Sequence, residues 1–232
     1  MFTQSDNIRD FVFPLATARR VGNAIELVRF LGTAFVIGNR GFALTARHVI
    51  AGAVEHPMIG VFALPDGGWF SVGIAAVESH PSEDVAVVQL EGGPWRSFFR
   101  LAGTNENSSA RYRLFGYPDD ATYELVDSGQ VTPRPDLVYN EGYFRRRFTG
   151  RLLGIDGSAF FELSQVAGSG ASGAPVCKFS APAWEVMGVY VGEKLNDRAT
   201  SVSYAVREDA FRDWTPNVLG TTVMAESRNV SV

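Results

Sequence analysis

The chain has 232 residues, of which 46% are hydrophobic and 20% are charged, and its formal net charge at pH 7 is −4. This composition is typical of a folded globular protein and excludes a disordered chain. The acidic balance lacks the basic face that nucleic-acid binding needs, and no run approaches the roughly 18 apolar residues of a membrane-spanning helix. We therefore expect neither nucleic acid nor membrane as a partner.

The N-terminal run FVFPLATA, at residues 11–18, ends like the cleavage site of a signal peptide. Two aspartates precede the run, where a signal peptide carries positive charge, and Pro14 interrupts it. The single cysteine, Cys177, allows no intrachain disulfide and fits a reducing compartment. We expect a cytoplasmic protein in which residues 1–22 form an N-terminal extension.

Short β-rich runs, separated by turn residues, recur along the remaining chain. In chain order they are 33–38, 41–46, 69–77, 84–90, 112–117, 123–132, 151–156, 159–164, 174–179, 184–191 and 201–206. Many short strands at close spacing predict barrels or sandwiches rather than a parallel sheet. Helix is expected only at 46–52 and 207–214.

A polar stretch without periodicity, at residues 102–111, divides these runs into two groups. It predicts a first lobe over 23–104 and a second lobe over 105–216 that ends in a short helix. Residues 217–232 have little apolar periodicity, and we expect them to form a loose tail.

Only three histidines could serve as a base: His48 after an apolar strand, His56 in a polar turn and His80, which we expect on a loop surface. Their spacing with one cysteine is not that of a zinc site, and no glycine-rich phosphate loop precedes a helix. No metal or organic cofactor is therefore expected.

A serine nucleophile needs a base, a carboxylate and backbone N–H donors. The segment AGSGASGAPV at 167–176 offers Ser169 and Ser172 in a glycine-rich turn.

Chain order separates the classes of serine hydrolase. An α/β-hydrolase places its histidine after the nucleophile, whereas every histidine here precedes residue 167. A subtilisin-like order needs an acid in suitable surroundings before His48, and Asp6, Asp10 and Glu26 do not provide one. The order that remains is histidine, then aspartate, then serine.

Three blocks in that order resemble the trypsin-like (chymotrypsin-fold) serine peptidases of the bacterial, disulfide-free type. GTAFVIGNRGFALTARHVIAG at 32–52 is similar to the family's Gly-Thr-x-Phe and Thr-Ala-x-His segments, HPSEDVAVVQL at 80–90 to its Asp-Val-Ala segment, and GSGASGAPV at 168–176 to its Gly-x-Ser-Gly-x-Pro. The strands at 186–192 and 201–206 form a looser fourth block. The resemblance implies an all-β fold of two six-stranded antiparallel β-barrels.

The resemblance also implies roles for single residues. His48 would be the general base, Asp84 its orienting acid and Ser172 the nucleophile, with the N–H groups of Gly170 and Ser172 as the oxyanion hole. Ser172 is favoured over Ser169 because it alone has Gly two before, Gly after and Pro three after. Alternation turns Glu83 away from the face that Asp84 uses.

The substrate pocket implied by the resemblance would be lined by Val166, Tyr190, Val191 and Gly192. No acidic residue lies near Val166 to bind the side chain of an Arg or Lys. We therefore expect a pocket that accepts small or apolar side chains. Animal digestive members of the family are activated when cleavage frees a new N-terminus that pairs with an acidic residue just before the nucleophile. In this chain Ala171 stands there and has no carboxylate, so a cut after Arg20 is not expected to activate the protein.

The leading hypothesis is thus a serine endopeptidase, a hydrolase that cleaves protein or peptide substrates through an acyl-enzyme. Two alternatives remain open: a non-catalytic peptide-binding module on the same fold, and a peptidase that stays inactive until a regulatory protein orders its loops.

The basic run at 145–147, with Arg151 beyond it, is either a solvated strand end or loop, or a docking site for an acidic partner.

Overall fold

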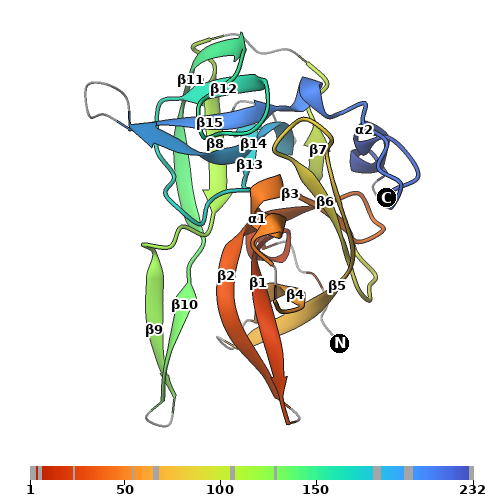
Figure 1. Ribbon diagram of the computed structural model, residues 1–232, viewed down its shortest axis with the longest axis vertical. Helices are drawn as coiled ribbons and strands as arrows, with labels where there is room; N and C mark the ends of the chain where they lie inside the picture. The colour runs from red at the N-terminus through yellow and green to blue at the C-terminus, as the bar shows by residue number, and fades with distance from the viewer. Residues whose placement is uncertain are drawn as a thin grey trace.

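The first β-lobe is a closed barrel of six antiparallel strands (Figure 1). The structure is a computed structural model that describes residues 4, 7–22, 24–53, 55–64, 68–104, 108–127, 130–179, 184–195 and 201–229. The barrel strands are β1 (Val12–Val21), β2 (Ala24–Ile37), β3 (Phe42–Thr45), β4 (Met58–Ala63), β5 (Trp69–Ser79) and β6 (Ala86–Leu90), in the spatial order β1-β2-β3-β6-β5-β4. A short 3₁₀ turn, η1 (Ile8–Asp10), precedes β1, and helix α1 (Arg47–Ala51) follows β3.

The predicted N-terminal extension over 1–22 is wrong, because β1 belongs to the barrel. It pairs with β2 along its length and with β4 at Leu15–Thr17. Phe13 and Leu15 are fully buried, and the Phe13 ring stacks on Phe62 of β4 at 4.6 Å. The apolar run that resembles a signal peptide is therefore a wall of the first barrel.

The second lobe is built on a seven-stranded sheet. Its strands are β7 (Phe99–Leu101), β8 (Arg111–Gly116), β11 (Val138–Thr149), β12 (Ala159–Leu163), β13 (Pro175–Lys178), β14 (Trp184–Leu195) and β15 (Ser201–Arg207), in the order β13-β8-β11-β12-β15-β14-β7. Because β13 also pairs with β14, six of these strands form a ring, while β7 joins β14 in parallel. Strands β9 (Thr122–Asp127) and β10 (Gln130–Pro135) make a separate hairpin that projects from this lobe (Figure 1). The predicted all-β fold is confirmed.

Residues 151–156 do not form the predicted strand. They make a loop between β11 and β12 that contains only an isolated bridge between Leu152 and Ile155. Leu153 is 90% exposed, whereas Leu152 and Ile155 are partly buried against the core.

The predicted loose tail over 217–232 is wrong for its described part, residues 217–229. Helix α2 (Val223–Ser227) packs on the molecule with Val223 fully buried. The buried Glu226 carboxylate pairs with Arg40, and Ser227 Oγ accepts a hydrogen bond from the Leu101 amide at 3.2 Å. The helix predicted at 207–214 is instead the end of β15 followed by a 3₁₀ turn, η2 (Glu208–Ala210).

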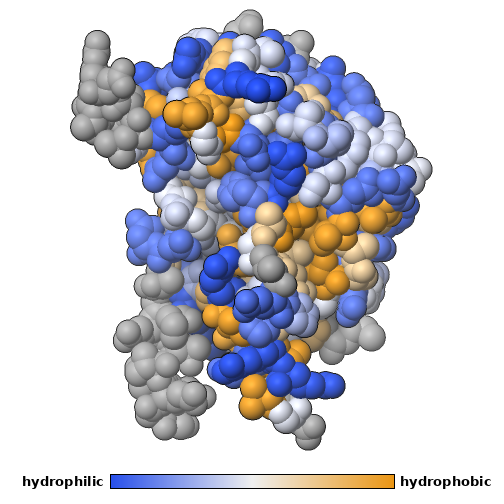
Figure 2. All heavy atoms as spheres, in the orientation of Figure 1, coloured by the Kyte–Doolittle hydropathy of each residue, from blue (hydrophilic) through white to orange (hydrophobic). Residues whose placement is uncertain are grey.

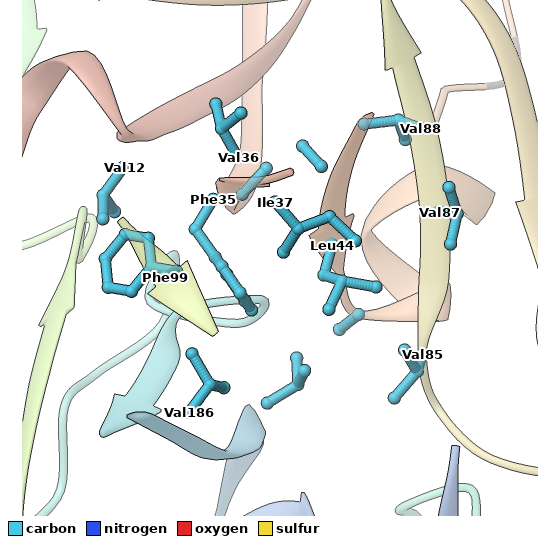
Figure 3. Close-up of a cluster of buried hydrophobic side chains, with 14 of the residues drawn as sticks. Val12, Phe35, Val36, Ile37, Leu44, Val85, Val87, Val88, Phe99 and Val186 are labelled. Carbon is cyan, nitrogen blue, oxygen red and sulfur yellow. The ribbon is translucent and has the colours of Figure 1, made fainter. Parts of the chain in front are cut away.

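One apolar core joins the two lobes (Figure 3). Phe35 and Leu44 of the first barrel belong to the same buried cluster as Val186 of β14. Phe99 of β7 bridges them, because its ring lies 5.4 Å from that of Phe35 and 5.9 Å from that of Trp184. Shared packing of this kind fixes the lobes relative to each other.

No helix in the described ranges is long and apolar enough to cross a membrane.

Candidate active site

Asp84 holds His48 at two points. Strand β3 ends at Thr45, and α1 begins at Arg47, which places His48 in the first turn of the helix. Asp84 Oδ1 accepts a hydrogen bond from the His48 backbone amide at 2.9 Å, and Asp84 Oδ2 lies 2.7 Å from His48 Nδ1. A carboxylate can only accept, so this contact assigns the ring hydrogen to Nδ1 and leaves the Nε2 lone pair free. The Asp84 side chain is buried, whereas the His48 side chain is 46% exposed.

Glu83 points away from Asp84 and into the second lobe. Its carboxylate accepts hydrogen bonds from the Ser158 amide at 2.9 Å and from Ser158 Oγ at 2.7 Å. The side chain is almost fully buried, so these donors compensate for the loss of water. Glu83 therefore fastens the turn that carries Asp84 to the β11–β12 loop. No local sequence pattern indicates this role, because the partner lies 75 residues away.

His80 is buried, and its predicted position on a loop surface is wrong. Its Nδ1 accepts hydrogen bonds from the amides of Ser82 (3.3 Å) and Glu83 (2.9 Å), and its ring meets the Trp214 ring edge-on at 5.0 Å. Burial lowers the pKa of His80 below its ordinary value, so the neutral ring that these contacts require is favoured. His80 thus supports the turn before Asp84.

The glycine-rich loop that carries Ser172 docks on Thr33 of β2. The Thr33 amide donates to the Ser172 carbonyl at 2.8 Å, and Thr33 Oγ1 donates to the Gly170 carbonyl at 2.9 Å. Gly173 has φ +94°, and a Cβ there would lie 1.9 Å from the Thr33 carbonyl oxygen. Only glycine fits this approach.

The Ser172 backbone and helix α1 meet at Gly32. A Cβ on Gly32 would lie 2.6 Å from Val49 Cγ2 and 2.8 Å from the Ser172 carbonyl oxygen. Val49 follows His48 in α1, so the structure brings the Ser172 loop against the element that carries His48. Strand β2, with Gly32 and Thr33, is the joint between the two lobes at this site.

Two backbone donors of the loop are unused. Among the described residues, neither the Gly170 amide nor the Ser172 amide makes a hydrogen bond. The Ser172 hydroxyl likewise has no hydrogen-bond partner in the described ranges, and Ser172 is half-buried. Ser169, the other candidate, is exposed, and its carbonyl accepts a hydrogen bond from the Asp119 amide at 2.6 Å. The loop can therefore offer free N–H groups next to the Ser172 hydroxyl.

The residues expected to line the substrate pocket occupy different depths. Tyr190 is fully buried, its hydroxyl accepts a hydrogen bond from the Ala167 amide at 3.3 Å, and burial raises its pKa to about 12. Val191 is buried, while Val166 and Gly192 are half-buried. The Tyr190 ring therefore fills the interior beneath the 165–167 segment and presents no open surface.

Each arginine at 145–147 forms an ion pair within the molecule. They lie inside β11 rather than at a strand end or in a loop. Arg145 and Arg146 pair with Glu162 at 3.2 and 2.7 Å, and Arg147 pairs with Asp209 at 2.5 Å. Part of the charge that would attract an acidic partner to this run is therefore already compensated.

The two β-lobes, with the carboxylate–histidine pair on one and the glycine-rich serine loop on the other, define a chymotrypsin-like fold. The chain belongs to the trypsin-like peptidase family, since the model of the trypsin-like peptidase domain matches residues 32–189, more than half of the sequence. The expected family resemblance is confirmed.

Three solved structures with a similar fold are distant from this chain in sequence. The MamO protease domain from Magnetospirillum magneticum is 12% identical with a TM-score of 0.60, over 85% of this chain and 92% of that one. The HtrA-type protease AlgW with a decapeptide is 18% identical (TM-score 0.57), over 86% of this chain and 61% of AlgW. The Rv3671c protease from M. tuberculosis in its active form is 19% identical (TM-score 0.56), over 86% and 76%. No curated protein matches significantly.

Proposed function

We propose that this chain is a serine endopeptidase with His48, Asp84 and Ser172 as its triad. The observation that carries the proposal is the double contact of Asp84 with the amide and Nδ1 of His48, at 2.9 and 2.7 Å. This contact fixes the ring and its tautomer, which is the task of the acid in such a triad. Membership of the trypsin-like peptidase family supports peptide-bond hydrolysis as the reaction.

The proposed reaction has two halves. Ser172 Oγ attacks the scissile carbonyl carbon while His48 Nε2 takes the hydroxyl proton; the C–N bond then breaks, and the amine leaves with that proton. Water next attacks the acyl-enzyme ester, its proton passes to His48, and Ser172 Oγ recovers a proton as the acid leaves. The amides of Gly170 and Ser172 stabilise the oxyanion, and one such donor contributes about 10²–10³ in turnover.

The loop is proposed to form without cleavage of the N-terminus. Ala171 offers no carboxylate to a new ammonium group, and Val21 of β1, which a cut after Arg20 would expose, is paired with Ala24 of β2. The contacts with Thr33 hold the loop instead. We propose that the residue before the scissile bond is small or apolar, since Val166 carries no charge and the Tyr190 ring occupies the interior below it.

Cleavage of a fluorogenic peptide library tests the proposal. We expect the wild-type protein to cleave substrates with small or apolar residues before the scissile bond, and Ser172→Ala and His48→Ala to be inactive. Ser169→Ala is the matched control, and it should keep activity. A strong preference for Arg or Lys would contradict the proposed pocket, and activity in Ser172→Ala would contradict the assigned nucleophile.

A partner-gated peptidase or a non-catalytic peptide-binding module is the second candidate function. The observation that favours it is the Ser172 hydroxyl, which makes no hydrogen bond with His48 in the described ranges. Such bonds often tighten only when substrate is present, so we prefer the constitutive enzyme. A wild-type protein that binds peptides, cleaves none and forms no covalent adduct would favour the second candidate.

A further inference from the structure

A cavity of about 330 Å³ lies next to the His48–Asp84 pair, between the two lobes. Arg47, which precedes His48, and Ser82, two residues before Asp84, contribute one wall. The β11–β12 loop contributes the other, with Arg151, Asp156 and Ser158. Figure 2 shows hydrophilic residues where the lobes meet around α1.

Arg47 is held in place at the mouth of this cavity. Its Nη2 lies 2.9 Å from Asp156 Oδ2, and its Nη1 donates to the His80 carbonyl at 3.3 Å. The Arg47 side chain is 26% exposed, and the Asp156 side chain is 72% exposed. A guanidinium has five N–H donors. After its contacts with Asp156 and the His80 carbonyl, Arg47 therefore still has N–H donors for another acceptor. An ion pair with so exposed a carboxylate costs little to exchange.

Arg151 supplies the second cation of the cavity. It is exposed and makes no ion pair or hydrogen bond with any residue that the structure describes. The buried Glu83 carboxylate is already occupied by the amide and hydroxyl of Ser158, which also lines the cavity. Two guanidinium groups and one exposed carboxylate, Asp156, therefore line a cavity whose first wall comes from the chain neighbours of His48 and Asp84.

We propose that this cavity is a subsite for an acidic side chain of the peptide substrate, bound by Arg47 and Arg151. This inference rests on the proposed peptidase function. The carboxylate of a Glu or Asp near the scissile bond would replace Asp156 as the ion-pair partner of Arg47. The same carboxylate would also pair with Arg151. Arginine suits this role because its planar fork binds a carboxylate with two parallel hydrogen bonds.

A positional peptide library with either Glu or Gln at each position around the scissile bond tests the subsite. We expect kcat/KM to be roughly five- to tenfold higher for Glu than for Gln at one position, and the ratio to fall with added salt. In Arg151→Gln the ratio should drop towards one, and in Asp156→Asn it should rise, because the competing carboxylate is removed. Arg145→Gln, whose partner is Glu162 on β12, is the matched control and should keep the wild-type ratio.

A binding measurement separates failure of the subsite from failure of the peptidase. Fluorescence anisotropy of the same labelled peptides with Ser172→Ala gives the Glu-to-Gln ratio of Kd without any cleavage. If wild-type protein cleaves peptides but neither kcat/KM nor Kd favours Glu at any position, the subsite is wrong and the peptidase stands. If nothing is cleaved while Kd still favours Glu through Arg151, the peptidase is wrong and the acidic-peptide site stands. A preference for Glu that persists in Arg151→Gln would also overturn the assignment.

Discussion

At the scale of the residue, the orientation of His48 depends on one carboxylate. Asp84 accepts hydrogen bonds from both the backbone and the ring of His48, at 2.9 and 2.7 Å. The backbone contact ties the start of α1 to the same carboxylate that orients the ring. Asp84 is therefore a structural anchor as well as the proposed orienting acid.

We predict that Asp84→Asn lowers turnover by about 10⁴, the loss expected when an amide N–H favours the wrong histidine tautomer. The shape of the side chain is kept, so the folded state should persist. Steady-state peptide hydrolysis and circular dichroism measure the two quantities. Asp213→Asn changes an 84% exposed carboxylate and is the control. Unchanged turnover in Asp84→Asn would contradict the assigned role.

His80 makes stability depend on pH. Burial lowers the pKa of its ring below the ordinary value of 6.5, so the unfolded chain binds a proton that the folded chain excludes. The free energy of unfolding should therefore fall as the pH drops below 6.5, because the unfolded state then takes up the proton. His80→Asn keeps a side-chain acceptor without this titration. Urea unfolding at pH 7 and pH 5 should show a smaller loss in the variant, and an equal loss would contradict the account.

At the scale of the element, the Ser172 loop takes its shape from its contacts with β2 together with its own glycines. The Thr33 amide and hydroxyl hold the carbonyls of Ser172 and Gly170, and Gly173 donates to the Tyr190 carbonyl at 2.7 Å. The loop is therefore pressed between strands of both lobes. Its glycines allow the loop backbone to lie close to the backbone of β2.

Gly173→Ala should displace this loop. The added Cβ would lie 1.9 Å from the Thr33 carbonyl oxygen, at a φ of +94°, so the loop must move away from β2. We expect a loss of on the order of 2 kcal/mol in stability and loss of peptide cleavage, although Ser172 itself is unchanged. Gly220→Ala is the control, because Gly220 also has a positive φ but no atom lies within 4 Å of its added Cβ. Cleavage at the wild-type rate in Gly173→Ala would contradict this account of the loop.

The sequence predicted the elements that show local patterns. The runs at 33–38 and 41–46 are strands because β-rich residues meet a tight turn, and the Asp84 and Ser172 motifs carry local glycine or turn signals. It missed β1, whose pattern is interrupted by Pro14 and ends in Arg19 and Arg20. It also missed the roles of Glu83 and His80, because their partners are tertiary.

At the scale of the whole molecule, the two lobes share one core. The Phe99 ring contacts those of Phe35 in the first barrel and Trp184 in the second sheet, and β7 pairs with β14. The candidate site lies across the same junction. The relative position of the lobes thus determines whether His48 and Ser172 can act together. Long-range packing of this kind could not be predicted from the sequence pattern.

We predict that both lobes unfold in one transition, because separating them would expose this core. Phe99→Ala should lower the stability of both by about 3–5 kcal/mol, the cost of a large cavity. Hydrogen exchange with peptide resolution, followed through a urea titration, measures each lobe separately. Two transitions at clearly different urea concentrations in the wild-type protein would contradict a shared core.

The most direct test of the central claim is the reaction of the folded protein with a fluorophosphonate, followed by mass mapping of the modified residue. The account predicts one adduct, on Ser172, that disappears in His48→Ala and does not require cleavage after Arg20. An adduct on Ser169, or a folded wild-type protein that forms none, would contradict it.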